Sequence, residues 1–417
     1  MLRAALVGGS RGTNAGVFGV LSETSAYSVS GVSPDVLDDD VLAAWDRLFA
    51  AQPAPSNPFL ASTWALQWYE KFVAPADRLV LVVRRKDSDG QPGDVVAVVP
   101  MHFLRRGLGP VTLARRLLPV GAGLGVTPYE LPGVLCDNGS VREIVRALTS
   151  ACLSMSVDWA ELAFDPDQCW FEWEWLDGST ADLTFGECVR SRACVILPLQ
   201  ATWDETRTTL KRNVKESVRR SANRLKKDGR PWEVVRRGAD LDRAVAERFL
   251  QLHEQRSSFE RATSRQHPNA YAADSHRRMI LDALPQLGRE GRASMFELHL
   301  DGEHVASQLA LHSPGTSYVH SSGFREDTWE LGVVTHLQAE LIRHAVERGD
   351  TVVNFSPGPN VSKLRWSERL WITHEFAFGA GPSSLMARGA AFTGLSYFKA
   401  LKQARSRHQS QLAGRGK

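Results

Sequence analysis

One lysine in the C-terminal third of the chain stands just past a short apolar run and a turn. The run 351–355 breaks at the Pro- and Gly-rich residues 356–360, and Lys363 comes just past them. A cation outside the carboxyl end of a strand can neutralise a substrate phosphate or an oxyanion that develops during a reaction. A solvent-exposed lysine is the commoner situation. Lys363 is therefore a candidate catalytic residue that needs partners around it.

Four further polar side chains are candidates for the same site. His253 lies in a stretch expected to be a helix, and an ordinary imidazole titrates near neutrality, as a general base requires. Tyr318 and His320 alternate along an expected strand and so share a face, and with Gln308 they could line a cleft. The alternatives are a structural, hydrogen-bonded histidine and packing within the sheet.

A strand–helix–strand unit is needed to bring these residues together. Residues 317–322 form an expected strand, and the helix after it ends at Arg348-Gly349, before a second expected strand at 351–355. The apolar residues at helical spacing are Val333, Val334, Leu337, Leu341, Ile342 and Ala345. Such a crossover implies two parallel neighbouring strands with a right-handed connection. Ligands bind outside the carboxyl ends of such strands, where the candidate loops lie.

Composition narrows the class of protein. The 417 residues suit two domains, and the 43% hydrophobic and 23% charged fractions are those of an ordinary globular protein. With a net charge of +3, the whole molecule is no obvious nucleic-acid binder. The five cysteines form no C-x-x-C pair, which favours a reducing compartment. Because no apolar run approaches the roughly 20 residues of a membrane span, we expect a cytoplasmic protein without a membrane segment.

The order of the expected elements divides the chain into four parts. Residues 1–30 show no period and predict a loose, disordered tail, and residues 386–417 predict a basic helical appendage. Residues 31–195 and 196–385 each combine expected strands and helices, which predicts two mixed α/β domains. The glycine-rich run 121–125 lacks the Lys-Ser/Thr of a P-loop, so a plain turn is favoured over a phosphate site.

Residues 203–230 are expected to form one helix with a strongly basic outer face. Ten basic residues against four acidic ones leave this segment at +6. A solvated helix face is one interpretation. The other is a docking surface for a polyanion, which could be the phosphates of coenzyme A, a nucleotide-linked sugar or an RNA acceptor stem.

Four short stretches carry a resemblance to a known family. They are Gly323-Phe324, Glu347-Arg348-Gly349, Asn354-Phe355-Ser356-Pro357-Gly358 and Lys363-Leu364-Arg365-Trp366. Together they resemble the C-terminal signature of the CelD-like (BcsL/CelD) acetyltransferases of the GNAT superfamily, which is related to the FemAB-type aminoacyl transferases. The family pattern has an aspartate at Asn354 and a tyrosine at Ser362, and these departures bear on the acceptor more than on the fold. His253 and Arg256 match an L-H-x-x-R element associated with the family.

The resemblance implies an α/β fold with mixed α+β sheets, arranged as tandem GNAT-like domains of FemAB type. It also implies an N-acyltransferase that moves an acyl group from acyl-CoA, such as acetyl-CoA, to an amine of a small molecule or sugar. The glycine motif for the coenzyme A phosphates is reduced to Gly332, which raises the alternative of an aminoacyl-tRNA donor bound through the helix at 203–230. A degenerate, non-catalytic GNAT pair that only binds ligands is a third alternative. No nucleophile motif is visible, so direct transfer is favoured over an acyl-enzyme.

The candidate residues fall into three groups. Catalytic candidates are Lys363, His253 and Tyr318. Substrate-binding candidates are Arg256, Gln308, His320, Asn354, Gly358 and Tyr129, the last from a segment that resembles an acidic-aromatic loop of the family. Donor-binding candidates are Ser322, Gly323, Gly332, Arg219, Arg220 and Arg224. We expect no metal, since the histidines lack metal-ligand spacing.

Overall fold

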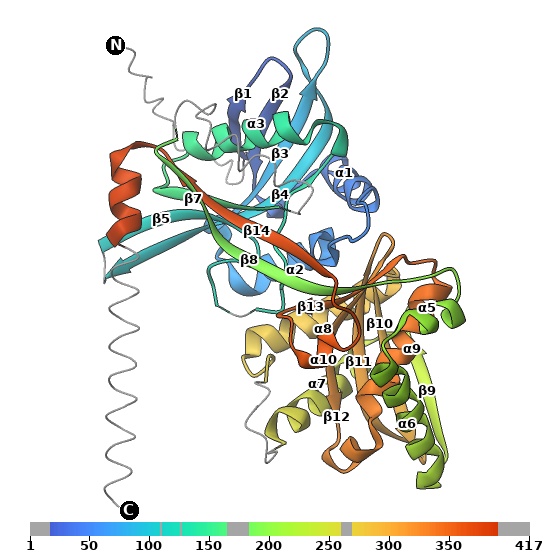
Figure 1. The fold of residues 1–417 in the computed structure, drawn as a ribbon. Coiled ribbons are helices and arrows are strands. Elements are labelled where there is room, and N and C mark those ends of the chain that lie inside the picture. Colours follow the sequence, from blue (N-terminus) through green and yellow to red (C-terminus); the bar gives the residue numbers. More distant parts are fainter. Residues whose placement is uncertain (1–16, 109–110, 126, 165–182, 260–268, 391–417) are drawn as a thin grey trace, which may run out of the picture.

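One mixed sheet runs through the whole molecule and carries helices on both faces (Figure 1). The computed structural model describes residues 17–108, 111–125, 127–164, 183–259 and 269–390. Within these residues the sheet has 14 strands in the order β1-β2-β3-β4-β5-β7-β14-β8-β13-β12-β11-β10-β9, and β6 pairs with β4.

The bounds of the elements are as follows. The strands are β1 (Val17–Glu23), β2 (Tyr27–Val32), β3 (Arg78–Lys86), β4 (Pro92–Leu108), β5 (Val111–Pro119), β6 (Leu135–Cys136), β7 (Trp159–Phe164), β8 (Phe185–Pro198), β9 (Trp232–Arg237), β10 (Ala293–Leu300), β11 (Glu303–Ser313), β12 (Thr316–Phe324), β13 (Val352–Pro357) and β14 (Leu370–Gly379). The α-helices are α1 (Asp39–Ala50), α2 (Ser62–Phe72), α3 (Val141–Ser154), α5 (Trp203–Thr209), α6 (Arg212–Asp228), α7 (Arg243–Ser258), α8 (Asp274–Arg289), α9 (Val333–Glu347) and α10 (Val361–Leu364). Short 3-10 turns are η1 (Pro34–Val36), η2 (Pro58–Leu60), η3 (Pro75–Asp77), η4 (Asn138–Ser140) and η6 (Glu326–Leu331).

The two halves of the sheet repeat one topology. In the N-terminal half, β3, β4 and β5 are antiparallel, and α3 crosses over to β7, which lies parallel to β5. In the C-terminal half, β10, β11 and β12 are antiparallel, and α9 crosses over to β13, which lies parallel to β12. The tandem GNAT-like arrangement and the strand–helix–strand unit expected from the sequence are therefore both present.

The strands that close the two halves are exchanged. β8 follows the N-terminal half in the chain but pairs with β13 of the C-terminal half, and β14 follows β13 but pairs with β7. β8 and β14 also pair with each other over residues 185–195 and 370–379, and they run side by side between the halves in Figure 1. The exchange makes the two half-sheets continuous.

Helices cover both faces of each half, and one core spans the two halves. α9 lies on one face of the C-terminal half with α6 outside it, while α7 and α8 lie on the other face. α2 of the N-terminal half packs against α8. Phe59 and Trp64 share a hydrophobic cluster with Phe249 and Tyr318. The hydroxyl of Ser56 donates to the Pro314 carbonyl at 2.6 Å, which adds a polar link between the halves.

Three boundaries differ from the sequence-based expectation. Residues 17–30, predicted to belong to a disordered tail, form β1 and most of β2, because alternate side chains such as Tyr27 and Val29 are buried against α3. The helix predicted over 203–230 is two helices, since Leu210 and the following Lys211 have extended backbone angles. The predicted boundary after residue 195 falls inside β8. Residues 1–16 and 391–417, which hold most of the predicted tail and appendage, lie outside the described residues.

Candidate active site

The parallel strands β12 and β13 pair over only three residues and then part. Their register joins Thr316–Ser317–Tyr318 to Val352–Val353–Asn354. β12 carries a bulge at His320, between the pairs Ala310–Val319 and Leu309–Ser321 of β11 and β12. We call the region between residues 319–324 of β12 and 355–357 of β13 the fork, and the last pair, Tyr318–Asn354, its closed end. A bulge that re-aims a strand and ends its pairing is a common device beside active sites.

β13 bends away because its local backbone is unusual. Ser356 has a φ of +66°, and its backbone N–H donates to the side-chain oxygen of Asn354 at 2.9 Å. A positive φ is uncommon for a residue other than glycine and must be held by its surroundings. Asn354 is fully buried and so fixes this bend from the closed end of the fork.

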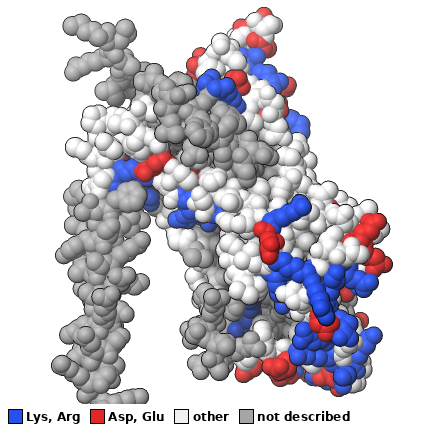
Figure 2. All heavy atoms as spheres, viewed as in Figure 1, with Lys and Arg blue, Asp and Glu red and all other residues white. Residues whose placement is uncertain are grey.

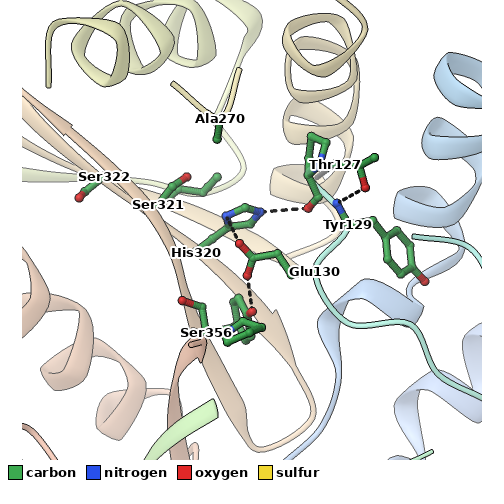
Figure 3. A network of polar contacts seen from close by, with 12 residues as sticks. Thr127, Tyr129, Glu130, Ala270, His320, Ser321, Ser322 and Ser356 are labelled. Carbon is green, nitrogen blue, oxygen red and sulfur yellow. Dashed lines mark hydrogen bonds and ion pairs between the residues drawn. The ribbon is translucent and has the colours of Figure 1, made fainter. Parts of the chain in front are cut away.

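A loop of the N-terminal half brings Glu130 to the closed end of the fork. The ring of Tyr129 is buried against Phe59, with ring centroids 5.5 Å apart. Gly121 makes room for that ring, since a Cβ there would lie 2.4 Å from it. Figure 3 shows the Tyr129 ring pointing away from the site and the carboxylate of Glu130 pointing into it. Tyr129, a substrate-binding candidate, is thus the anchor of the loop, and its neighbour is the residue that faces the fork.

The carboxylate of Glu130 contacts two residues of β12. Tyr318 donates its hydroxyl hydrogen to Oε2, and the Nδ1 of His320 lies 3.9 Å from Oε1 (Figure 3). His320 also places Nε2 3.3 Å from the Pro128 carbonyl, which requires a hydrogen on Nε2. In the neutral ring Nδ1 is then an acceptor. Burial raises the pKa of Tyr318 well above its usual value, so its hydroxyl remains a donor to Glu130.

Lys363 lies on the β13 side of the fork. Asn360 caps α10 by accepting from the backbone N–H of Lys363 at 3.1 Å. The ammonium donates to the Pro357 carbonyl at 2.7 Å, the Ser356 hydroxyl at 2.8 Å and the Ser356 carbonyl at 3.3 Å. All three partners are neutral. Burial lowers the pKa of Lys363, while the charge of Glu130 opposes this shift. Cys194 of β8 is buried close enough to interact with both charges, and burial raises the pKa of its thiol to about 12.

The other side of the fork is held by α7. Nδ1 of His253 lies 3.0 Å from the Ser322 carbonyl, and Nε2 accepts from the backbone N–H of Ala270 at 3.4 Å. Arg256 donates to the same Ser322 carbonyl at 2.9 Å and to the Ser322 hydroxyl at 2.7 Å. Both ring nitrogens of His253 therefore have backbone partners, so this geometry favours a strand-holding histidine over the predicted general base. Gln308 donates to the Ser321 carbonyl at 2.9 Å and braces the bulge.

Gly323 sets the distance between α7 and β12. A Cβ at this position would lie 2.4 Å from the backbone nitrogen of His253 and 2.6 Å from the carbonyl carbon of Leu252. We expect Gly323→Ala to lower the free energy of unfolding by about 1–3 kcal/mol, as overpacking does in a closed interior. Urea denaturation measures this. Gly139→Ala is the control, because the nearest atom to its Cβ lies at 3.5 Å. Equal stability of both variants would mean that α7 is free to move away from β12.

The helix that follows β12 begins with an uncapped N-terminus. Gly332 stands at the N-cap of α9 with a φ of +74°, and as a glycine it has no side chain that could accept from the first turn. Arg365 donates to the hydroxyl of Thr335, in that first turn, at 2.9 Å. Burial lowers the pKa of Arg365, and its Nε has no hydrogen-bond partner among the described residues. A cation at the positive end of a helix is unfavourable alone. The N-terminus of α9 and the guanidinium of Arg365 together suit an anion bound between them.

The basic face of α6 lies outside this helix end. Seven basic residues minus two acidic ones give α6 a charge of +5. Arg219 and Arg220 are exposed and share Glu216 as an ion-pair partner. Arg224 donates to the Glu330 carbonyl at 2.6 Å and so touches the turn before α9. In Figure 2 lysine and arginine side chains gather over the part of the molecule where α6 lies.

The candidate residues thus fall into separate places. Tyr318, His320, Asn354 and Lys363 surround the closed end of the fork, while Gly358 is exposed in the turn beyond it. His253, Arg256, Ser322 and Gly323 form its α7 side. Gly332 and Arg224 lie at the start of α9, and Arg219 and Arg220 lie outside on α6. In the described residues no group of three or more His, Cys, Asp or Glu side chains has the geometry to hold a metal ion.

Sequence reasoning missed two residues that the geometry brings forward. Glu130 belongs to the Tyr129-Glu130 stretch that resembles an acidic-aromatic loop of the family, but only Tyr129 of that stretch was chosen as a candidate. Arg365 belongs to the Lys363-Leu364-Arg365-Trp366 stretch, and it had no signal of its own because a basic residue after a turn is most often exposed.

Comparisons with known proteins agree with this architecture. Residues 212–364, from α6 to α10, match the family model described as acetyltransferase (GNAT) domain. The crystal structure of FemX aligns with a TM-score of 0.54 and 13% identity, over 81% of this chain and 95% of that one. A conserved protein of unknown function from Bacteroides thetaiotaomicron aligns with a TM-score of 0.53 and 14% identity, over 82% and 98%. A search of curated proteins gave no match.

The fold and the matched domain define a class. The chain has the GNAT fold in the FemX-like arrangement, and it contains a GNAT acetyltransferase domain that includes both sides of the fork. It is therefore an acyltransferase. The narrower resemblance to the CelD-like family stays a prediction, since the matching model describes the GNAT domain in general terms. In the described part of the chain no helix has both the length and the apolar character of a membrane crossing.

Proposed function

We propose that the protein is an N-acyltransferase that moves an acyl group from acyl-CoA to an amine of a small molecule or sugar. The observation that carries this proposal is the fork, because its closed end places the carboxylate of Glu130 beside strand edges that have no pairing partner. An amine that enters there meets a base, and a carbonyl that enters along β12 meets backbone groups.

The chemistry needs a neutral amine, a fixed carbonyl and a place for the leaving thiol. Glu130 binds the ammonium form of the acceptor and accepts one of its protons. The amine nitrogen then attacks the thioester carbon, so that a C–N bond forms and the C–S bond breaks. Backbone N–H groups along the unpaired edge of β12 can stabilise the oxyanion of the tetrahedral intermediate. A second proton passes from the nitrogen to the sulfur, and coenzyme A leaves as a thiol.

The donor's phosphates fit the start of α9. The helix N-terminus offers free backbone N–H groups, Thr335 and Arg365 lie at its first turn, and Arg224 lies beside it. An anion there would also supply the hydrogen-bond partner that the Nε of Arg365 lacks among the described residues. These residues extend the donor-binding set beyond Gly332 and Arg224.

Acetyl-CoA provides the test. We expect it to raise the melting temperature of the protein, since a ligand that binds only the native state stabilises it. We also expect release of free coenzyme A when an amine is present, measured with a thiol reagent. The Arg365→Gln variant should lose most of the thermal shift. A protein that neither gains stability from acetyl-CoA nor releases thiol with any amine would contradict the proposal.

A second candidate donor is an aminoacyl-tRNA, and the observation that favours it is the exposed basic face of α6. Salt-sensitive retention of charged tRNA would support it, because binding to phosphates releases counterions. Arg219→Gln with Arg220→Gln should remove that retention, whereas Arg224 also supports the turn before α9 and is left unchanged. We place either reaction in the cytoplasm, in keeping with free thiols at Cys136, Cys152 and Cys194.

A further inference from the structure

Two groups of opposite charge, the carboxylate of Glu130 and the ammonium of Lys363, lie around the closed end of the fork without forming an ion pair. Glu130 lies on the loop from the N-terminal half, and its field acts on the ammonium of Lys363. In the described part of the chain no carboxylate lies within 4.0 Å of that ammonium. Each charge instead has neutral partners: the Tyr318 hydroxyl for Glu130, and the Ser356 and Pro357 oxygens for Lys363.

This arrangement is electrostatically incomplete in the free protein. Withdrawing an ammonium from water costs free energy, and neutral oxygens repay only part of it. A lysine that served only the fold would gain more from a direct carboxylate partner or from exposure to solvent. Lys363 is only partly exposed, has no carboxylate partner among the described residues, and is held in place by the Asn360 cap and the turn at Ser356. A ligand that carries both a positive and a negative charge would give Glu130 and Lys363 each an oppositely charged partner.

A second observation points to an acceptor of hydrogen bonds on the Lys363 side. Asn354 is fully buried, its side-chain oxygen accepts from the backbone N–H of Ser356, and its Nδ2 has no partner of ordinary hydrogen-bond geometry among the described residues. The Asn354 side chain interacts with the thiol of Cys194, which is a weak hydrogen-bond partner. A donor left in this state beside a lysine suits an incoming carboxylate oxygen.

We propose that the acceptor is a zwitterion, a small molecule that carries its reactive amine and a carboxylate together, as an amino acid does. Its ammonium group binds Glu130 and its carboxylate binds Lys363. The inference rests on the proposed function and adds the class of acceptor to it. An amino sugar without a negatively charged group would leave the ammonium of Lys363 without an anionic partner. An amine that carries a phosphate would bring two negative charges to one lysine.

Binding without any donor tests this proposal. The probes are a panel of L-amino acids, each beside its carboxamide, which lacks the negative charge, and its N-acetyl derivative, which lacks the positive charge. Phosphoethanolamine is the phosphate-bearing arm. Calorimetry and thermal shift report binding, and thiol release with acetyl-CoA reports transfer. For at least one amino acid we expect affinity and kcat/KM about 10- to 100-fold above those of its carboxamide, the range for a lost charged hydrogen bond.

Two variants locate the effect. In Lys363→Met the amino acid and its carboxamide should become equivalent, because both then lack a cation to bind. In Glu130→Gln the amino acid should bind more weakly, while binding of the N-acetyl derivative stays unchanged. A single cooperative thermal transition, at or above the wild-type melting temperature for Lys363→Met, confirms that the variants fold.

The outcomes separate this inference from the function on which it rests. A wild-type protein that binds no amino acid, or treats each one like its carboxamide, overturns the zwitterion, as does a preference for phosphoethanolamine or a preference that persists in Lys363→Met. If amino acids bind with the expected preference but acetyl-CoA yields no transfer, the acyl-CoA donor is wrong and the zwitterion stands. If amines without a carboxylate are acylated with the same kcat/KM as amino acids, the acyl-CoA donor is supported and the zwitterionic acceptor is wrong.

Discussion

Glu130→Gln is expected to lower kcat/KM for acyl transfer by about 100- to 10,000-fold at neutral pH, the range that a positioned general base contributes. The amide keeps the size of the side chain and an oxygen that can accept from the Tyr318 hydroxyl. It loses the charge that binds the ammonium and the capacity to take up its proton. Thiol release from acyl-CoA, followed with the best acceptor of the wild type, measures the effect.

The neighbouring residue supplies the control. The hydroxyl of Tyr129 is buried and has no hydrogen-bond partner among the described residues, so Tyr129→Phe should leave the loop and the reaction almost unchanged. A Glu130→Gln enzyme within roughly twofold of the wild type would remove the carboxylate from the chemistry. It would leave His320 as the next base to examine, because its Nδ1 faces the same space.

Lys363→Met is expected to change activity and stability in opposite directions. The variant should lose about 10- to 100-fold in kcat/KM with a carboxylate-bearing acceptor, because one charged contact is removed. It should also resist denaturation better than the wild type, since a partly buried ammonium held by neutral oxygens costs more than a methyl-terminated side chain of similar length. Urea midpoints and initial rates on the same preparations measure both effects.

The pH dependence of stability checks the second effect by its sign. Burial lowers the pKa of Lys363 below 10.5 in the folded protein, so between that lowered pKa and 10.5 the unfolded chain binds more protons than the folded one. The contribution of Lys363 to the free energy of unfolding must therefore rise with pH through this window. Lys363→Met should lack this rise.

Lys71 is the opposite case and the matched control. Although burial acts to lower the pKa of Lys71, its hydrogen bonds to Asp282 and Glu70 raise it overall. Lys71→Met should therefore destabilise the protein near neutral pH. A Lys363→Met protein that is less stable than the wild type, as Lys71→Met should be, would show that Lys363 serves the fold.

Local patterns were sufficient to predict the elements that carry the site. The unit from β12 through α9 to β13 was predicted because strand and helix periods are properties of a few neighbouring residues. The same reasoning placed Tyr318 and His320 on one face, and both rings do pack against Phe59. The distances from the Phe59 ring centroid are 5.2 Å to the ring of Tyr318 and 5.7 Å to the ring of His320. It also placed Lys363 beyond the end of β13, with its ammonium turned toward the strand end.

Long-range packing decided what the sequence could not. Glu130 meets Tyr318 only because the Tyr129 ring is seated against Phe59 in a core that the two halves share. Nothing within the loop itself encodes that contact. His253 lies in the predicted helix, but the face it occupies is set by how closely α7 approaches β12 at Gly323, and that face turns both ring nitrogens toward backbone groups. Periodicity in the sequence predicts that a residue lies in a helix, but it does not predict which groups its side chain contacts.

The exchanged strands β8 and β14 have a consequence for motion and for inheritance. The last strand of each half-sheet comes from the chain segment of the other half. A hinge motion that separates the halves would therefore break the backbone hydrogen bonds that join β7, β14, β8 and β13. We therefore expect Glu130 and Lys363 to keep a nearly constant spacing throughout a catalytic cycle. For the same reason we expect that loss of either repeat during evolution would be disfavoured, since the remaining half-sheet would lose the strand that covers its edge.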